Sequence, residues 1–221
     1  MSLLPSAKRL NAAGWMSVAC ALLSSLFSIP YFMVLGFTHP LFSAFLVTIQ
    51  LLVAVTAIGA YVNLAFLLNG PYRFKRANLP IGLLVVSIAV GTLLSIFFHL
   101  PAILPALQVS PMILIGLSSA SGILAALIHI LLALTLRPLW KVVPRLNVYG
   151  WALLCFGVCS LLASTGYWLP GLSRLIVPLT FIARFVTFCA LAGVFFGTAR
   201  MAKAGWSNAL LAQAENDTKR A

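Results

Sequence analysis

The positions of the charged residues limit the possible folds of this chain more than any other feature of its sequence. Asp and Glu are absent before Glu215, whereas Lys and Arg occur in clusters separated by long apolar stretches. The clusters fall at residues 8–9, 73–76, 137–145 and 200–203, with Lys219 and Arg220 near the far end. Positively charged loops of membrane proteins stay on the cytoplasmic side. This rhythm therefore predicts a polytopic membrane protein in which every second loop is cytoplasmic.

The composition agrees with this interpretation and excludes a water-soluble domain. Hydrophobic residues make up 62% of the chain and charged residues only 7%, against about 25% charged residues in soluble domains. The net charge of +12 is spread over separate loops and forms no single basic stripe, so we expect no nucleic-acid partner. We expect the basic loops to attract anionic membrane lipids instead.

Six segments are long and apolar enough to span a bilayer, which takes about 20 residues each. They cover residues 12–35, 41–68, 79–100, 112–136, 148–169 and 178–199, joined on the outer side by links at 36–40, 101–111 and 170–177. The predicted fold is an all-α integral membrane protein, a six-transmembrane-helix bundle. An even number of spans places both termini on the same side of the membrane, and the basic loops indicate that this side is the cytoplasm. We expect the membrane to be the bacterial cytoplasmic membrane.

The predicted organisation is one transmembrane domain, residues 1–200, followed by a polar cytoplasmic tail, residues 201–221. Trp206 and Leu210 of the tail are spaced to form a short interfacial helix.

A degenerate repeat precedes every second segment. The triplets are Arg9-Leu10-Asn11, Arg76-Ala77-Asn78 and Arg145-Leu146-Asn147. Their spacing of roughly 68 residues predicts three repeated helical hairpins. The alternative is chance similarity, because such residues favour the start of membrane segments in unrelated proteins.

Arg184 is the most costly residue of the predicted helices, because an arginine at the centre of a membrane helix costs about 2.5–3.5 kcal/mol. No predicted helix contains an acid that could pair with it. Its charge must therefore be compensated by water, backbone carbonyls, a neutral amide, an anionic ligand or lipid, or an acid on another subunit.

Several polar residues match Arg184 in depth or in repeat position within the outer half, and they form our candidate ligand-binding site. They are Gln50, Ser28, Ser95, Ser164 and Ser118. We hypothesise an outer-half polar pocket with Arg184 as its charged floor, because a guanidinium binds a carboxylate or phosphate in bidentate fashion. The alternative is that the helix enters the membrane at Pro178, which leaves Arg184 about 9 Å deep, so that its side chain snorkels outward while the serines bond to backbone carbonyls one turn back. If the helix enters near Arg174, the depth is about 15 Å and snorkelling is strained.

Two further features predict helix contacts. Gly193 and Gly197 form a GxxxG pattern that permits close helix packing, on a face nearly opposite Arg184. His129 shares a face with Ser118 and Gly122, so we expect a neutral ring hydrogen-bonded to an adjacent helix.

No metal or cofactor is predicted. His99 and His129 differ in depth by about 20 Å, too far apart to bind one haem, and His39 and His99 have no third ligand for zinc. We expect Cys20, Cys155, Cys159 and Cys189 to act as buried, small apolar residues.

Two hypotheses of function follow. The helices contain no carboxylate for acid–base chemistry, so enzyme activity is not predicted. The first hypothesis is binding or transport of a small anionic or amphiphilic ligand, such as a lipid. The second is a non-catalytic subunit that packs against partner transmembrane proteins or copies of itself.

Overall fold

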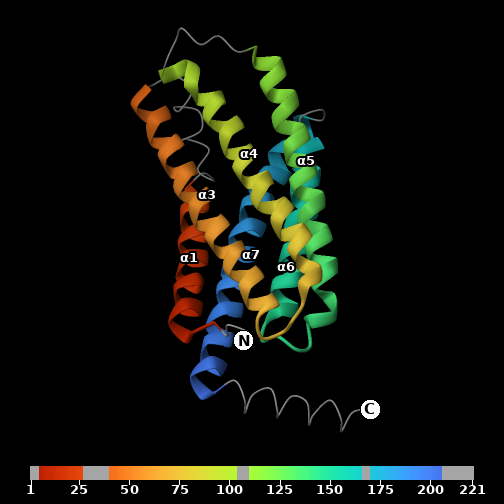
Figure 1. Ribbon diagram of the computed structural model, residues 1–221. Coiled ribbons are helices and arrows are strands. Elements are labelled where there is room, and N and C mark those ends of the chain that lie inside the picture. The colour runs from red at the N-terminus through yellow and green to blue at the C-terminus, as the bar shows by residue number, and fades with distance from the viewer. Residues whose placement is uncertain (1–4, 27–39, 104–109, 166–169, 206–221) are drawn as a thin grey trace.

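The computed structural model describes residues 5–26, 40–103, 110–165 and 170–205, and these residues form an all-α membrane bundle (Figure 1). Six α-helices and two 3-10 helices make up the described part, which contains no strand. The α-helices are α1 (Ala7–Leu26), α3 (Pro40–Asn69), α4 (Asn78–Ile103), α5 (Pro111–Leu136), α6 (Leu146–Thr165) and α7 (Pro170–Ala204). The 3-10 helices η1 (Lys75–Ala77) and η2 (Arg137–Leu139) follow α3 and α5.

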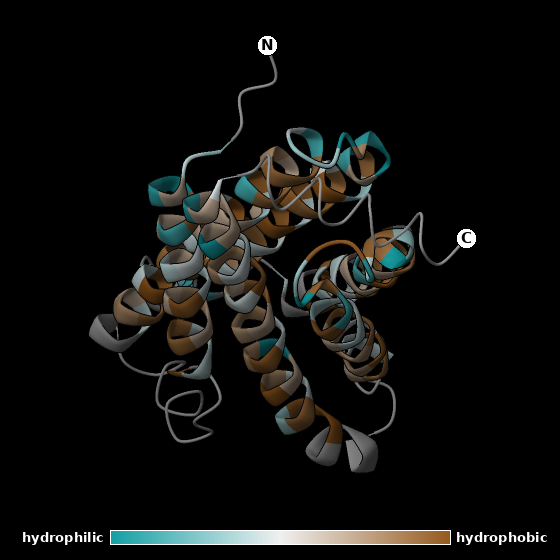
Figure 2. Cartoon of the chain, turned by 90° about the horizontal axis from the view of Figure 1, so that it is seen from below, coloured by the Kyte–Doolittle hydropathy of each residue, from teal (hydrophilic) through white to brown (hydrophobic). Residues whose placement is uncertain are grey.

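Among the described residues, five helices, α3 to α7, are long and apolar enough to cross a membrane. Apolar residues cover most of the helical ribbon (Figure 2), and many large apolar side chains point outward. These observations confirm the predicted fold class and fit an integral membrane protein. Helix α1 starts at Ala7, earlier than predicted, and residues 27–35 of its predicted span lie outside the described residues.

Most predicted spans agree with the helices, but the predicted link at 170–177 is wrong. Helix α7 begins at Pro170 and runs through Pro178 to Ala204. Proline suits the first turn of a helix, where its missing N–H has no intrahelical partner. In a membrane bundle an internal proline is also tolerated, because neighbouring groups satisfy the freed carbonyl. The helix also extends past the predicted domain boundary at residue 200, while Trp206 and Leu210 lie outside the described residues.

The six α-helices form a closed ring. Each packs against its neighbours in the chain, and α7 packs against α1. The ring is thus built of three hairpins, α1–α3, α4–α5 and α6–α7, in the order that the predicted repeat requires. A common origin of the hairpins stays a prediction.

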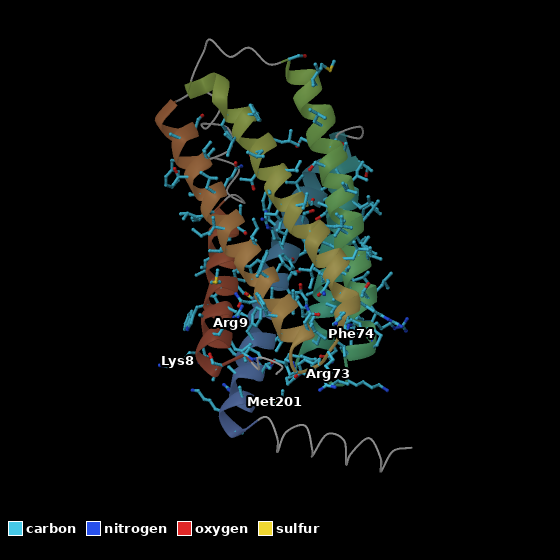
Figure 3. The ribbon with its side chains drawn as sticks, viewed as in Figure 1. Lys8, Arg9, Arg73, Phe74 and Met201 are labelled. Carbon is cyan, nitrogen blue, oxygen red and sulfur yellow. The ribbon has the colours of Figure 1, made fainter. Side chains whose placement is uncertain are left out.

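The basic clusters gather at one end of the ring. The labelled residues Lys8, Arg9, Arg73 and Met201 all lie there (Figure 3). The Arg9 guanidinium donates from Nε to Asn63 Oδ1 at 2.9 Å, and its Cζ lies 4.1 Å from the centre of the Phe66 ring. This end is called the basic end below.

The large, fully buried side chains lie in the half of the ring nearest the basic end. The largest fully buried side chains all belong to that half of their helices: Leu10, Tyr61, Leu64, Leu67, Leu68, Leu84, Leu132, Leu136, Leu146, Tyr149, Leu153 and Phe195. Close packing leaves few voids larger than a water molecule. The bundle is therefore sealed at the basic end.

The GxxxG pattern of α7 contributes to this sealed half in a way that the sequence did not predict. A Cβ on Gly193 would lie 3.4 Å from Arg145 Cδ, and one on Gly197 would lie 3.2 Å from Pro144 Cβ. The two glycines therefore leave space for the turn before α6 to pack against α7, and they do not mark a contact with a neighbouring helix.

Candidate functional site

A cavity of about 400 Å³ lies between the sealed half and the opposite end of the ring. Helices α3, α4, α5, α6 and α7 all contribute to its wall. Its lining includes Gln50, Leu84, Ser87, Gly91, Thr92, Ser95, Ser118, Ser121, Gly122, His129, Phe156, Phe181 and Arg184. We call it the main cavity.

The main cavity exists because two of its walls are built from small side chains. Helix α4 presents Ser87, Gly91 and Ser95 at intervals of four residues, and α5 presents Ser118 and Gly122. Residues four apart lie on one face of a helix. In the sealed half, leucines and aromatic rings fill the corresponding positions. The same ring of helices is therefore closed in one half and hollow in the other.

Arg184 lines the main cavity from α7 and is partly buried. Within the described part of the chain, its guanidinium has no carboxylate within ion-pair distance and no hydrogen-bond partner. Because α7 begins at Pro170, Arg184 lies about 21 Å along the helix from its start. Its depth in a membrane stays a prediction, because the candidate membrane span of this helix begins at Ile176.

Gln50 reaches the same cavity from α3. Its Oε1 atom is buried, and no donor bonds to it among the described residues. An unsatisfied buried acceptor costs about 1–3 kcal/mol. Such groups are rare in native proteins and require a specific explanation.

The serines of the main cavity differ from hydroxyl residues elsewhere in the bundle. Most of the latter donate to the carbonyl one helical turn back, as Ser17 and Ser24 do at 3.0 and 2.6 Å. No such bond, and no other protein hydrogen bond, occupies the hydroxyls of the cavity serines in the described structure: these are Ser87, Ser95, Ser118 and Ser121. The back-bonded serines of the snorkelling alternative are therefore not found at Ser95 and Ser118.

A second cavity of about 240 Å³ opens between α5, α6 and α7 and is called the side cavity. It shares Phe181 and Arg184 with the main cavity, so Arg184 lies where the two meet. Ser164 of the predicted site lines the side cavity. The structure thus brings Gln50, Ser95 and Ser118 to one cavity with Arg184, and Ser164 to its neighbour.

Of two further serines, one is not described and one lies away from the main cavity. Ser28 lies outside the described residues. Ser119, which is level with Ser118, turns away from the main cavity and donates to the carbonyl of Ser164 at 3.0 Å. That bond fastens α5 to α6.

The expected hydrogen bond from His129 to an adjacent helix is wrong. Its Nδ1 lies 2.6 Å from the carbonyl oxygen of Ala125 in the same helix. The imidazole of His129 contacts α6 instead through an edge-to-face arrangement with the Phe156 ring, with ring centroids 4.8 Å apart. Because a carbonyl only accepts, Nδ1 carries the proton, and in a neutral ring Nε2 is left as an acceptor. His129 lines both cavities.

Cysteines and metal ligands are not gathered at the site. Cys20 is buried, but Cys155 and Cys189 lie on the outer surface of the ring. The expectation that all four cysteines are buried is therefore wrong for these two, and Cys159 is only partly buried. Among the described residues, no three His, Cys, Asp or Glu side chains form a group that could hold a metal ion.

Sequence reasoning missed several lining residues: Ser87, Thr92, Ser121, His129, Phe156 and Phe181. One signal could have found Ser87, because it precedes Gly91 and Ser95 at four-residue spacing. The aromatic residues carry no comparable signal in a chain that is apolar throughout.

Comparisons of the chain with protein-family models, with curated proteins and with solved structures gave no match. The chemistry of the cavity must therefore carry the functional interpretation.

Proposed function

We propose that this protein binds a small anionic or amphiphilic ligand in the main cavity, for binding or transport at the bacterial cytoplasmic membrane. The observation that carries the proposal is Arg184, a cation that faces a cavity without an acid beside it. In a membrane, such a charge is expensive and is characteristic of a substrate pathway or binding site.

The nature of the charge decides the ligand class. A guanidinium offers five N–H donors in a planar fork and accepts nothing. Its strongest partners are carboxylates and phosphates, which it binds with two parallel hydrogen bonds. In surroundings of low dielectric constant, this attraction is stronger than in water. An anionic group at Arg184 is therefore the best compensation that a ligand can supply.

The size and lining of the main cavity support a small organic ligand. Its volume of about 400 Å³ lies within the roughly 300–1,000 Å³ typical of small-molecule sites. Phe156, Phe181 and Leu84 supply apolar walls, and a few polar groups stand among them. Such a mixture suits an amphiphile better than a bare inorganic ion.

The position of the cavity supports access from outside the cell. If positively charged loops remain in the cytoplasm, both termini and the sealed half face the cytoplasm, and the cavity lies toward the outer surface. The ligand then comes from the extracytoplasmic space or from the outer leaflet.

Binding of oleoyl lysophosphatidate to purified protein tests the proposal, with Arg184→Gln as the variant. We expect affinity to fall about 10- to 100-fold, because a hydrogen bond to a charged group contributes about 1.5–3 kcal/mol. Arg200→Gln is the matched control, since it removes the same charge from the exposed basic end of the same helix. Neutral monoolein should bind the wild type, the Arg184→Gln variant and the Arg200→Gln variant with equal affinity.

Unchanged lysophosphatidate affinity in Arg184→Gln would refute the proposal. If the variant instead loses a transmembrane protein that copurifies with the wild type, the second hypothesis, a packing subunit, takes its place. Mass spectrometry of the purified material distinguishes the two results.

A further inference from the structure

The hydrogen-bonding groups of the main cavity exceed what one anion needs. Besides Arg184, the cavity contains the Gln50 amide, whose Oε1 has no partner among the described residues. Four serine hydroxyls line the same cavity without a protein hydrogen bond in the described structure: Ser87, Ser95, Ser118 and Ser121. His129 adds Nε2 as an acceptor in the neutral ring.

These neutral groups share one chemical property, because a hydroxyl both donates and accepts, and a primary amide does the same through two different atoms. A fatty acid or a simple alkyl phosphate would satisfy Arg184 and leave the serines and Gln50 unpaired. A site that forms hydrogen bonds to the polar groups of its ligand discriminates against an analogue that lacks those groups. A ligand whose own groups both donate and accept would pair with them instead.

We infer that the ligand is an anionic polyol, in which a phosphate or carboxylate binds Arg184 and neighbouring hydroxyl groups bond to Gln50 and the cavity serines. The inference rests on the proposed function and specifies its substrate class. Two sources offer this chemistry, a free polyol phosphate such as glycerol 3-phosphate and the glycerol headgroup of an anionic lipid.

Thr92 and Ser119 show that the serines of the main cavity are a distinct group. Thr92 also lines the cavity, but its hydroxyl donates to the carbonyl of Ile88 at 2.8 Å. Ser119 uses its hydroxyl to join α5 to α6. Only a subset of the hydroxyls on these helices is therefore left for a ligand, and that subset faces the cavity with Arg184.

Two matched pairs of probes test the inference with wild-type protein in lauryldimethylamine oxide, a detergent without hydroxyl groups. The lipid pair is lysophosphatidylglycerol and lysophosphatidylpropanol, and the free pair is glycerol 3-phosphate and propyl phosphate. Within each pair, the anionic group is retained and only the hydroxyls differ. We expect the glycerol member of at least one pair to bind at least about 10-fold more tightly by calorimetry, and the pair that discriminates identifies the source.

Serine substitutions connect any preference to the cavity. A double substitution, Ser95→Ala with Ser118→Ala, should reduce the glycerol-to-propanol affinity ratio several-fold while the propanol probe keeps its affinity. Ser119→Ala is the control, and it should preserve the ratio because that hydroxyl does not face the cavity.

The result that overturns the inference is different from the result that overturns the proposed function. Equal affinities within both pairs would show that hydroxyls are not recognised, even if every anion binds through Arg184. Lysophosphatidate binding that is insensitive to Arg184→Gln would refute the anion site itself. A glycerol preference that survives the double serine substitution would also contradict the inference, because it would place recognition elsewhere.

Discussion

Gln50 shows at the level of one residue how a binding site can lower stability. Its buried Oε1 has no donor among the described residues, and an unsatisfied group of this kind costs about 1–3 kcal/mol. Stability and function commonly conflict at such positions. If a ligand donates to this oxygen, it recovers the lost free energy on binding.

Gln50→Leu should therefore raise the melting temperature of the ligand-free protein and weaken binding of the preferred anionic probe. The gain arises because an apolar side chain leaves no unpaired acceptor. Thermal unfolding in detergent and a binding titration check the two effects. Thr48→Val is the control on the same helix, because Thr48 is exposed and its hydroxyl already donates to Ala44. A destabilised Gln50→Leu protein would contradict this interpretation of Gln50.

The candidate site could be predicted in part from single residues. Helical rise placed Gln50 and Ser118 near the depth of Arg184, the repeat spacing placed Ser95 in the same outer half, and the structure brings these four to one cavity. Rise does not determine how each helix is rotated about its axis. Rotation depends on packing, which is why the sequence missed Ser121 and gave His129 the wrong hydrogen-bond partner.

At the level of helices, close packing between α5 and α6 depends on Gly157. A Cβ at this position would lie 2.7 Å from Ile130 Cγ1 and 3.1 Å from the carbonyl oxygen of Ala126. The second contact is with backbone, which cannot move aside cheaply. Small residues at such contacts let membrane helices approach closely.

Gly157→Ala should destabilise the protein by about 1–3 kcal/mol, as overpacking does in other well-packed interiors. A lower melting temperature in detergent is the expected measurement. Gly82→Ala is a matched control in α4, because a Cβ there meets nothing within 4 Å. Its melting temperature should stay the same or rise, since alanine favours a helix more than glycine. Equal effects at both positions would show that the α5–α6 contact is not specific.

Helix boundaries were predictable wherever the apolar stretch ended at a basic cluster or a clear break. The predicted span 41–68 differs from α3 by one residue at each end. The start of α7 was missed, because Pro178 and the polar residues before it are typical of a loop in sequence. A membrane helix can continue through a proline where neighbouring groups satisfy the freed carbonyl, and a single sequence contains no direct record of such neighbours.

At the level of the whole molecule, the basic clusters, the tightly packed half and the main cavity follow one another along the axis of the bundle. The basic clusters lie at the same end as the sealed half of the ring (Figure 3), and the main cavity lies in the other direction. The orientation of the protein in the membrane therefore decides which compartment supplies the ligand. A reversed orientation would make the same cavity open toward the cytoplasm.

Cysteine labelling in intact bacterial cells tests this orientation. The starting protein should have its four native cysteines replaced by alanine, because two of them lie on the surface of the ring. Ser110→Cys precedes α5 at the end opposite the basic end, and Lys75→Cys lies in a basic turn; both positions are exposed. Because basic loops remain inside, a membrane-impermeant maleimide should label position 110 in intact cells and position 75 only after permeabilisation. The reverse pattern would place Arg184 in a cavity supplied from the cytoplasm, which would exclude uptake from outside while leaving the chemistry of the cavity unchanged.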